Sequence, residues 1–123
     1  MVTNKDEIND PEKNLELLMR RWTMFILKDM FLGARRFNDF LKMNPHISGK
    51  VLSDQLKNLE NYGYIEKIVV SKTPLRAEYV LTKKGRGMNK MLYELMAFAG
   101  EHLDIDPECE LWKGDNLKKT FGV

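Results

Sequence analysis

The side chains best able to do chemistry in this 123-residue chain are cations gathered in its middle. Residues 35–90 hold 12 Lys and Arg against 5 Asp and Glu, a net charge of +7, whereas residues 1–34 carry −1 and residues 91–123 carry −4. A basic region between two acidic ends is typical of a surface that binds a polyanion. Chance clustering of charge on solvated faces explains this pattern, taken alone, equally well.

One predicted helix, residues 49–62, has small and charged side chains opposite its apolar side. Such a polar face fits the major groove of DNA, where the first residues of the helix contact base edges and phosphates. An ordinary surface helix with its polar face in water is the alternative. The candidate DNA contacts at this helix are Ser48, Gly49, Lys50, Ser53, Asp54, Gln55 and Lys57.

Two further groups of cations flank this helix. Arg35 and Arg36 open the preceding predicted helix, where guanidinium and backbone N–H groups together suit a phosphate. Lys72, Thr73 and Arg76 lie at the tip and base of a predicted hairpin, which fits a contact with the DNA backbone or minor groove. A solvated arginine pair and a generic polar turn are the alternatives. The order of all these features along the chain favours double-stranded DNA as the partner.

The elements that must position these residues follow from hydrophobic periodicity. Helical spacing changes to β-rich, alternating sequence after Gly63 and returns after Thr82. Two helices joined by a tight turn and followed by a hairpin predict an α+β, mostly α fold, a winged helix-turn-helix. The expected elements are helices 11–21, 23–32, 36–43 and 49–62, strands 65–70 and 76–81, and one long helix, 82–100.

The chain ends are expected to lie outside this fold. Residues 1–9 read as a flexible N-terminal arm, residues 10–102 as the winged-helix domain, and residues 103–123 as an irregular C-terminal tail with at most a short helical piece. The polar start has no secretory signal, and no apolar run approaches the roughly 20 residues of a membrane span. The sequence therefore predicts a cytoplasmic protein with no membrane contact.

Catalysis is not supported by the residues. The histidines, His46 and His102, are far apart, and no metal-ligand spacing, nucleophile motif or phosphate loop is present. The chain has one cysteine, Cys109. We therefore expect no enzyme activity, no cofactor and no metal. A protein-interaction module or dimer scaffold that does not read DNA is the alternative function.

Five segments of the chain follow one another at characteristic spacings, residues 22–23, 36–40, 47–60, 63–65 and 76–85. These segments resemble the HxlR-type winged-helix regulators, relatives of the prokaryotic MarR group, and the likeness covers residues 10–102. The likeness implies a homodimeric transcription regulator. We expect it to bind a pseudo-palindromic operator through helix 49–62 and the wing 65–81. The likeness also implies dimerisation through helices 11–21 and 82–100. The expected interface residues are Leu15, Leu18, Met91, Leu95 and Phe98; monomer core is the alternative for some of them.

The chain departs from this family at one position. Many members carry a cysteine just before the Pro-x-Glu of the first helix, and some use it to sense thiol chemistry, but this sequence has Asp10 there. Cys109 lies in the tail and does not match that position, so we expect it to be an incidental thiol; a redox role is the alternative. The aromatic and Met-rich helices suggest a small-molecule effector at the dimer cleft, although core packing explains them as well.

Overall fold

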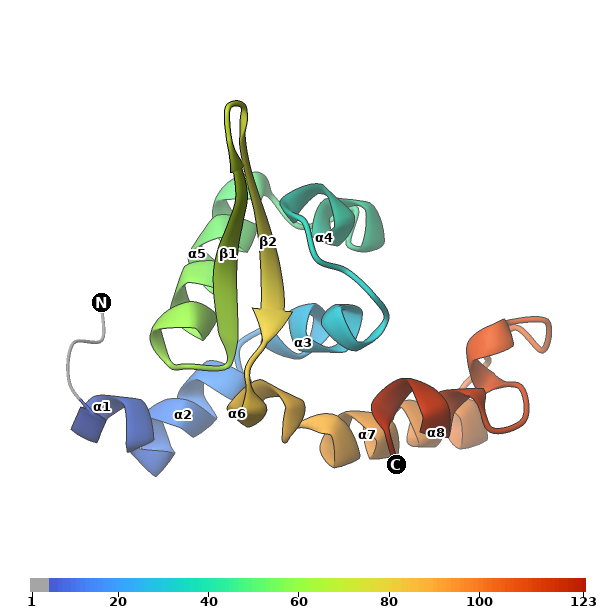
Figure 1. Cartoon of the computed structure of the whole chain (residues 1–123). Coiled ribbons are helices and arrows are strands. Elements are labelled where there is room, and N and C mark those ends of the chain that lie inside the picture. The colour runs from blue at the N-terminus through green and yellow to red at the C-terminus, as the bar shows by residue number, and fades with distance from the viewer. Residues whose placement is uncertain (1–4) are drawn as a thin grey trace. The chain divides into compact units, whose positions relative to one another are not determined.

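The computed structural model describes residues 5–123 (Figure 1). They divide into two compact units, one that ends at Arg86 and a second, Gly87–Val123. The first unit contains five helices, an antiparallel hairpin and a short sixth helix, in that order. The predicted fold class is confirmed, because the chain is mostly helical and its two strands form the wing of a winged helix-turn-helix.

The N-terminal segment is helical where an arm was expected. Helix α1 (Lys5–Asn9) precedes α2 (Pro11–Leu18), and residues 1–4 lie outside the described part. The side-chain amide of Asn14 donates to the carbonyl oxygens of Ile8 (2.8 Å) and Asp10 (2.6 Å). These contacts join α1 to α2, which explains why a short polar segment adopts a helix here.

The core of the first unit lies among three helices. Helix α3 (Thr23–Phe31) contributes the fully buried Ile26 and Leu27, α4 (Phe37–Met43) contributes Phe40, and α5 (Gly49–Asn61) packs against them. The buried residues of α5 are Leu52, Leu56 and Leu59, which share one face of the helix. The opposite face of α5 is therefore free to be polar.

The wing is longer than expected and is attached to the start of α4. Strand β1 (Ile65–Lys72) pairs with β2 (Leu75–Leu81) from Ile65 opposite Leu81 to Lys72 opposite Leu75. The backbone N–H of Tyr79 donates a 2.7 Å hydrogen bond to the carbonyl oxygen of Arg35. The base of the wing is thus held beside the helix-turn-helix, and its tip projects beyond α4 and α5 (Figure 1).

The single long helix predicted for residues 82–100 is wrong. The segment forms α6 (Lys83–Arg86) and, after a turn, α7 (Asn89–His102). Gly85 and Gly87 lower the helical propensity at the break. Gly85 also has a packing role, because a Cβ there would lie 2.1 Å from the carbonyl oxygen of Tyr64.

The tail is structured as part of the second unit, so the expected boundary at residue 102 does not coincide with the observed division. A 3₁₀ turn, η1 (Glu110–Trp112), leads to α8 (Asn116–Phe121). Leu117 and Phe121 of α8 are buried against α7, on which Leu92 is also fully buried. This segment was expected to be irregular because a helix of six residues depends on such tertiary contacts, which local sequence does not show.

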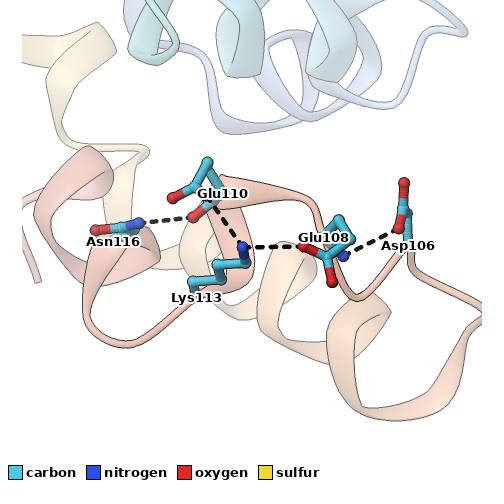
Figure 2. Close-up of polar contacts among 5 residues, drawn as sticks. All are labelled: Asp106, Glu108, Glu110, Lys113 and Asn116. Carbon is cyan, nitrogen blue, oxygen red and sulfur yellow. Dashed lines mark hydrogen bonds and ion pairs between the residues drawn. The ribbon is translucent and has the colours of Figure 1, made fainter.

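Polar contacts also order the acidic part of the tail (Figure 2). Lys113 Nζ lies 3.1 Å from Glu110 Oε1 and 3.5 Å from Glu108 Oε2, and the side-chain amide of Asn116 donates to the Glu110 carbonyl oxygen at 2.7 Å. The indole N–H of Trp112 donates to the carbonyl oxygen of Met96 at 2.9 Å, so η1 is anchored on α7.

Candidate nucleic-acid interface

One face of α5 gathers most of the predicted DNA contacts. Ser48 caps the helix, since its Oγ accepts from the backbone N–H of Val51 at 3.1 Å. Residues 50, 53, 54 and 57 recur at helical spacing on the side opposite the buried leucines. The predicted contacts that are exposed at this helix are Ser48, Gly49, Lys50, Ser53, Asp54 and Lys57.

An ion pair sits on this face. Lys50 Nζ lies 3.6 Å from Asp54 Oδ2, and the two side chains are 85% and 63% exposed. An exposed pair of this kind is weak, so DNA can replace it at little cost. Lys50 then has donors for guanine or phosphate, and Asp54 has acceptors for the amino group of cytosine.

Gln55 does not belong to the exposed face. Its Oε1 lies 3.2 Å from Oγ1 of the buried Thr23, so the side chain points toward α3. The buried position of Gln55 could be recognised from the sequence. Residue 55 shares one face of the helix with residues 52, 56 and 59, which are all leucines. Gln55 lies on that buried side.

The start of α4 differs from the expected phosphate site. The backbone N–H groups of Arg35 and Arg36 both donate to Asp39 Oδ2, at 3.0 and 2.9 Å. These two hydrogen bonds hold the pKa of the Asp39 carboxyl below its usual value. The backbone donors expected to bind phosphate are therefore occupied, and only the guanidinium groups, both on exposed residues, remain for DNA.

The wing presents its cations to solvent. Lys72, Thr73 and Arg76 are all exposed around the tip of the hairpin. Glu78 on β2 was not among the predicted site residues, yet its Oε2 lies 3.5 Å from Nη2 of Arg36. Glu78 thus competes with any phosphate for that guanidinium.

The predicted dimer residues are mostly exposed apolar side chains. Leu15 on α2 is 60% exposed and Leu18 is half-buried. On α7, Met91, Leu95 and Phe98 are 48%, 49% and 54% exposed and occupy one face, whereas the neighbouring Leu92 is buried. The monomer core therefore does not account for the three α7 residues.

Other kinds of site are not found in residues 5–123. In this part of the chain no cluster of three or more His, Cys, Asp or Glu side chains has a geometry that could hold a metal ion. None of the described helices is long and apolar enough to cross a membrane.

Comparison with known proteins identifies the family. Residues 17–107 match the model described as HxlR-like helix-turn-helix. The chain belongs to this HxlR-like family. It is 38% identical over 93 residues to the uncharacterized HTH-type transcriptional regulator YvaP of Bacillus subtilis (strain 168), covering 76% of this chain and 86% of YvaP. It is 33% identical over 100 residues to the HTH-type transcriptional regulator YodB of the same organism, covering 80% and 89% of the two chains.

Solved structures agree with this assignment. The redox regulator HypR in its oxidized form matches with a TM-score of 0.69 at 28% identity, over 76% of this chain and 97% of HypR. The putative HTH-type regulator ytcD matches with a TM-score of 0.68 at 33% identity, over 74% of this chain and 93% of ytcD. This HxlR-like protein is accordingly a DNA-binding transcription regulator, and its family is not one of enzymes.

Proposed function

We propose that this HxlR-like regulator binds a pseudo-palindromic operator as a homodimer, with α5 of each protomer in one of two successive major grooves about 34 Å apart. The observation that carries the proposal is the exposed polar face of α5, whose reverse side is held in the core by Leu52, Leu56 and Leu59. A helix fixed in this way presents its polar face at a constant angle. Ser48, Gly49, Lys50 and Ser53 lie nearest its first turn, where base edges are read.

The remaining cations supply affinity for the DNA backbone. Arg35 and Arg36 bind phosphates beside α4 through their guanidinium groups, and Lys72, Thr73 and Arg76 grip the flanking minor groove or backbone. Contacts of this kind position the protein without specifying sequence. Each cation that neutralises a phosphate adds to the salt dependence of binding.

Dimerisation uses the apolar face of α7 formed by Met91, Leu95 and Phe98, together with Leu15 and Leu18 of α2. Three large apolar side chains in a row, each about half exposed, support a partner surface, because such a stripe loses water contact when a second copy covers it. Two copies are also needed on physical grounds, since one short helix reads too few bases for specificity.

The test is binding of the purified protein to fragmented genomic DNA, including its own promoter, at two salt concentrations. We expect a few tight sites with internal two-fold symmetry that protect DNA in a footprint. Weak binding to every fragment, lost as salt rises, would contradict sequence-specific binding and favour the scaffold function.

We further expect a cytoplasmic location and a small-molecule effector. A cytoplasmic location follows from a role on chromosomal DNA in a prokaryote. A small-molecule effector at the dimer cleft would act by shifting the spacing of the two α5 helices, which requires different affinities for the two arrangements.

A further inference from the structure

The buried polar side chains of the described residues all lie on α3 or bond to it. They are Thr23, Asp29 and Asn44, which are 0%, 1% and 6% exposed. Burying a polar group in an apolar core is unfavourable unless it forms a hydrogen bond. The two helices of the helix-turn-helix, α4 and α5, each receive one of these polar contacts from α3.

The first contact links α3 to the middle of α5. Thr23 Oγ1 lies 2.8 Å from the carbonyl oxygen of Leu17 on α2 and 3.2 Å from Oε1 of Gln55 on α5. A hydroxyl carries one hydrogen, so when it donates to Leu17 the Gln55 amide, turned about its last bond, can donate to the same oxygen. Thr23 therefore joins α2, α3 and α5 at one point.

The second contact links α3 to the turn that precedes α5. The side-chain amide of Asn44, the residue that ends α4, donates to Asp29 Oδ2 at 2.6 Å and to the carbonyl oxygen of Phe40 at 3.0 Å. The N–H of Ile47, in the same turn, donates to the Asn44 carbonyl oxygen at 3.1 Å. Lys28 Nζ forms an ion pair with the other Asp29 oxygen at 3.0 Å, outside hydrogen-bond geometry.

The polar contacts of Thr23 and Asp29, which we call the anchors, fix the direction of α5 relative to α3. Apolar packing alone tolerates sliding of a helix, whereas hydrogen bonds restrict distance and angle. We propose that Thr23 and Asp29 are positioning residues for DNA reading: through Gln55 and Asn44 they set the tilt of α5 and hence where its polar face meets the bases. This inference rests on the proposed operator binding and assigns Gln55 to positioning, not to base contact.

The first test compares Thr23→Val and Asp29→Leu, which keep the number of side-chain heavy atoms and remove the polar contacts, with the wild type and with Thr23→Ser, which keeps the hydroxyl. We measure affinity for the operator, for random DNA, and for operators with one base pair added or removed between the half-sites. The Val and Leu variants should lose about tenfold in the ratio of operator to random affinity and should discriminate less between spacings. Thr23→Ser should stay within about twofold of the wild type.

Controls separate positioning from general destabilisation. Asp104→Asn makes the same charge change on an exposed residue of the second unit and should alter no ratio. A double-mutant cycle of Thr23→Val with Gln55→Leu should be non-additive in operator affinity. Unchanged ratios and spacing preference, with only a lower melting temperature, would overturn the inference.

A measurement without DNA distinguishes failure of this inference from failure of the proposed function. In hydrogen exchange of the free protein, Asp29→Leu and Thr23→Val should speed exchange in residues 44–56 and leave the wing unchanged. If no operator exists for the wild type, this local loosening still supports the anchors. If exchange in residues 44–56 is unaltered, the anchors do not hold α5 and the inference is wrong.

Discussion

Glu78 on the wing holds Arg36 at the start of α4, with Nη2 and Oε2 3.5 Å apart. The Arg36 side chain is 57% exposed and the Glu78 side chain 25% exposed, so the pair is open to solvent and weak on its own. The pair matters because the Arg36 guanidinium is also a candidate phosphate contact, so the Glu78 carboxylate and DNA compete for it. DNA must displace a carboxylate to use it.

Replacing Glu78 by Gln should strengthen binding to DNA of any sequence. The change frees Arg36 and removes one negative charge near the duplex, and we expect about two- to fivefold higher affinity at low salt with a steeper salt dependence. Titration of random-sequence DNA at several salt concentrations measures both. Glu66→Gln, on an exposed residue of β1, is the matched charge control. An equal gain in both variants would mean that only net charge matters.

Substitutions on α5 and on the wing should behave differently. Lys50→Ala or Ser53→Ala should cost about 1–3 kcal/mol at the operator and much less on random DNA, because base-edge contacts are lost. Lys72→Ala should weaken binding to the operator and to random DNA about equally. It should also reduce the slope of the salt dependence by about one phosphate contact for each lysine removed. Unchanged operator affinity in Lys50→Ala would mean that α5 is not the reading helix.

Charging the apolar face of α7 should produce folded monomers. Leu95→Asp or Phe98→Asp puts a carboxylate where the proposed partner protomer packs, yet both side chains are about half exposed in the single chain. Light scattering after gel filtration gives the mass, and circular dichroism checks the fold. Leu92→Asp should instead unfold the second unit, because Leu92 is fully buried. A dimer that survives both charged variants would exclude this face as the interface.

Gly100→Ala should displace Trp112. A Cβ at residue 100 would lie 2.4 Å from Cδ1 of the indole, so the ring must move and its hydrogen bond to Met96 must lengthen. We expect a loss of about 1–3 kcal/mol in unfolding free energy, as in other overpacked sites. Thermal unfolding and Trp112 fluorescence in a Trp22→Phe background provide the measurement. Glu101→Ala, on the exposed neighbour, should leave both signals in place.

The carboxylate of Asp39 should make the folding stability depend on pH. The backbone N–H groups of Arg35 and Arg36 lower the pKa of the Asp39 carboxyl in the folded state. Its contribution to folding stability is therefore present above the unfolded pKa of about 3.9 and is lost as the pH falls through the lower folded pKa. Asp39→Asn keeps an acceptor oxygen but does not titrate. The melting temperatures of the two proteins should therefore converge as the pH falls below about 4. Parallel curves over the whole pH range would contradict this role for Asp39.

Local patterns in the sequence predicted the elements that carry their own signals. Ser48 and Gly63 mark the limits of α5, and the change from helical to alternating spacing marks the wing. Features that depend on distant partners were missed. Helices α1 and α8 rely on Asn14 and Phe121, and the Arg36–Glu78 pair joins residues 42 positions apart, whose meeting depends on how the wing docks.

Asp10 has a consequence for how this regulator can receive a signal. Its carboxylate accepts from the backbone N–H of Lys13 at 2.8 Å and caps α2, an arrangement that contributes about 1 kcal/mol to a helix. A cysteine at this position would offer a reactive sulfur but a poor cap. One position cannot serve both purposes well, and in this chain it serves the helix cap. We expect its occupancy of DNA to be indifferent to oxidants that act through that thiol.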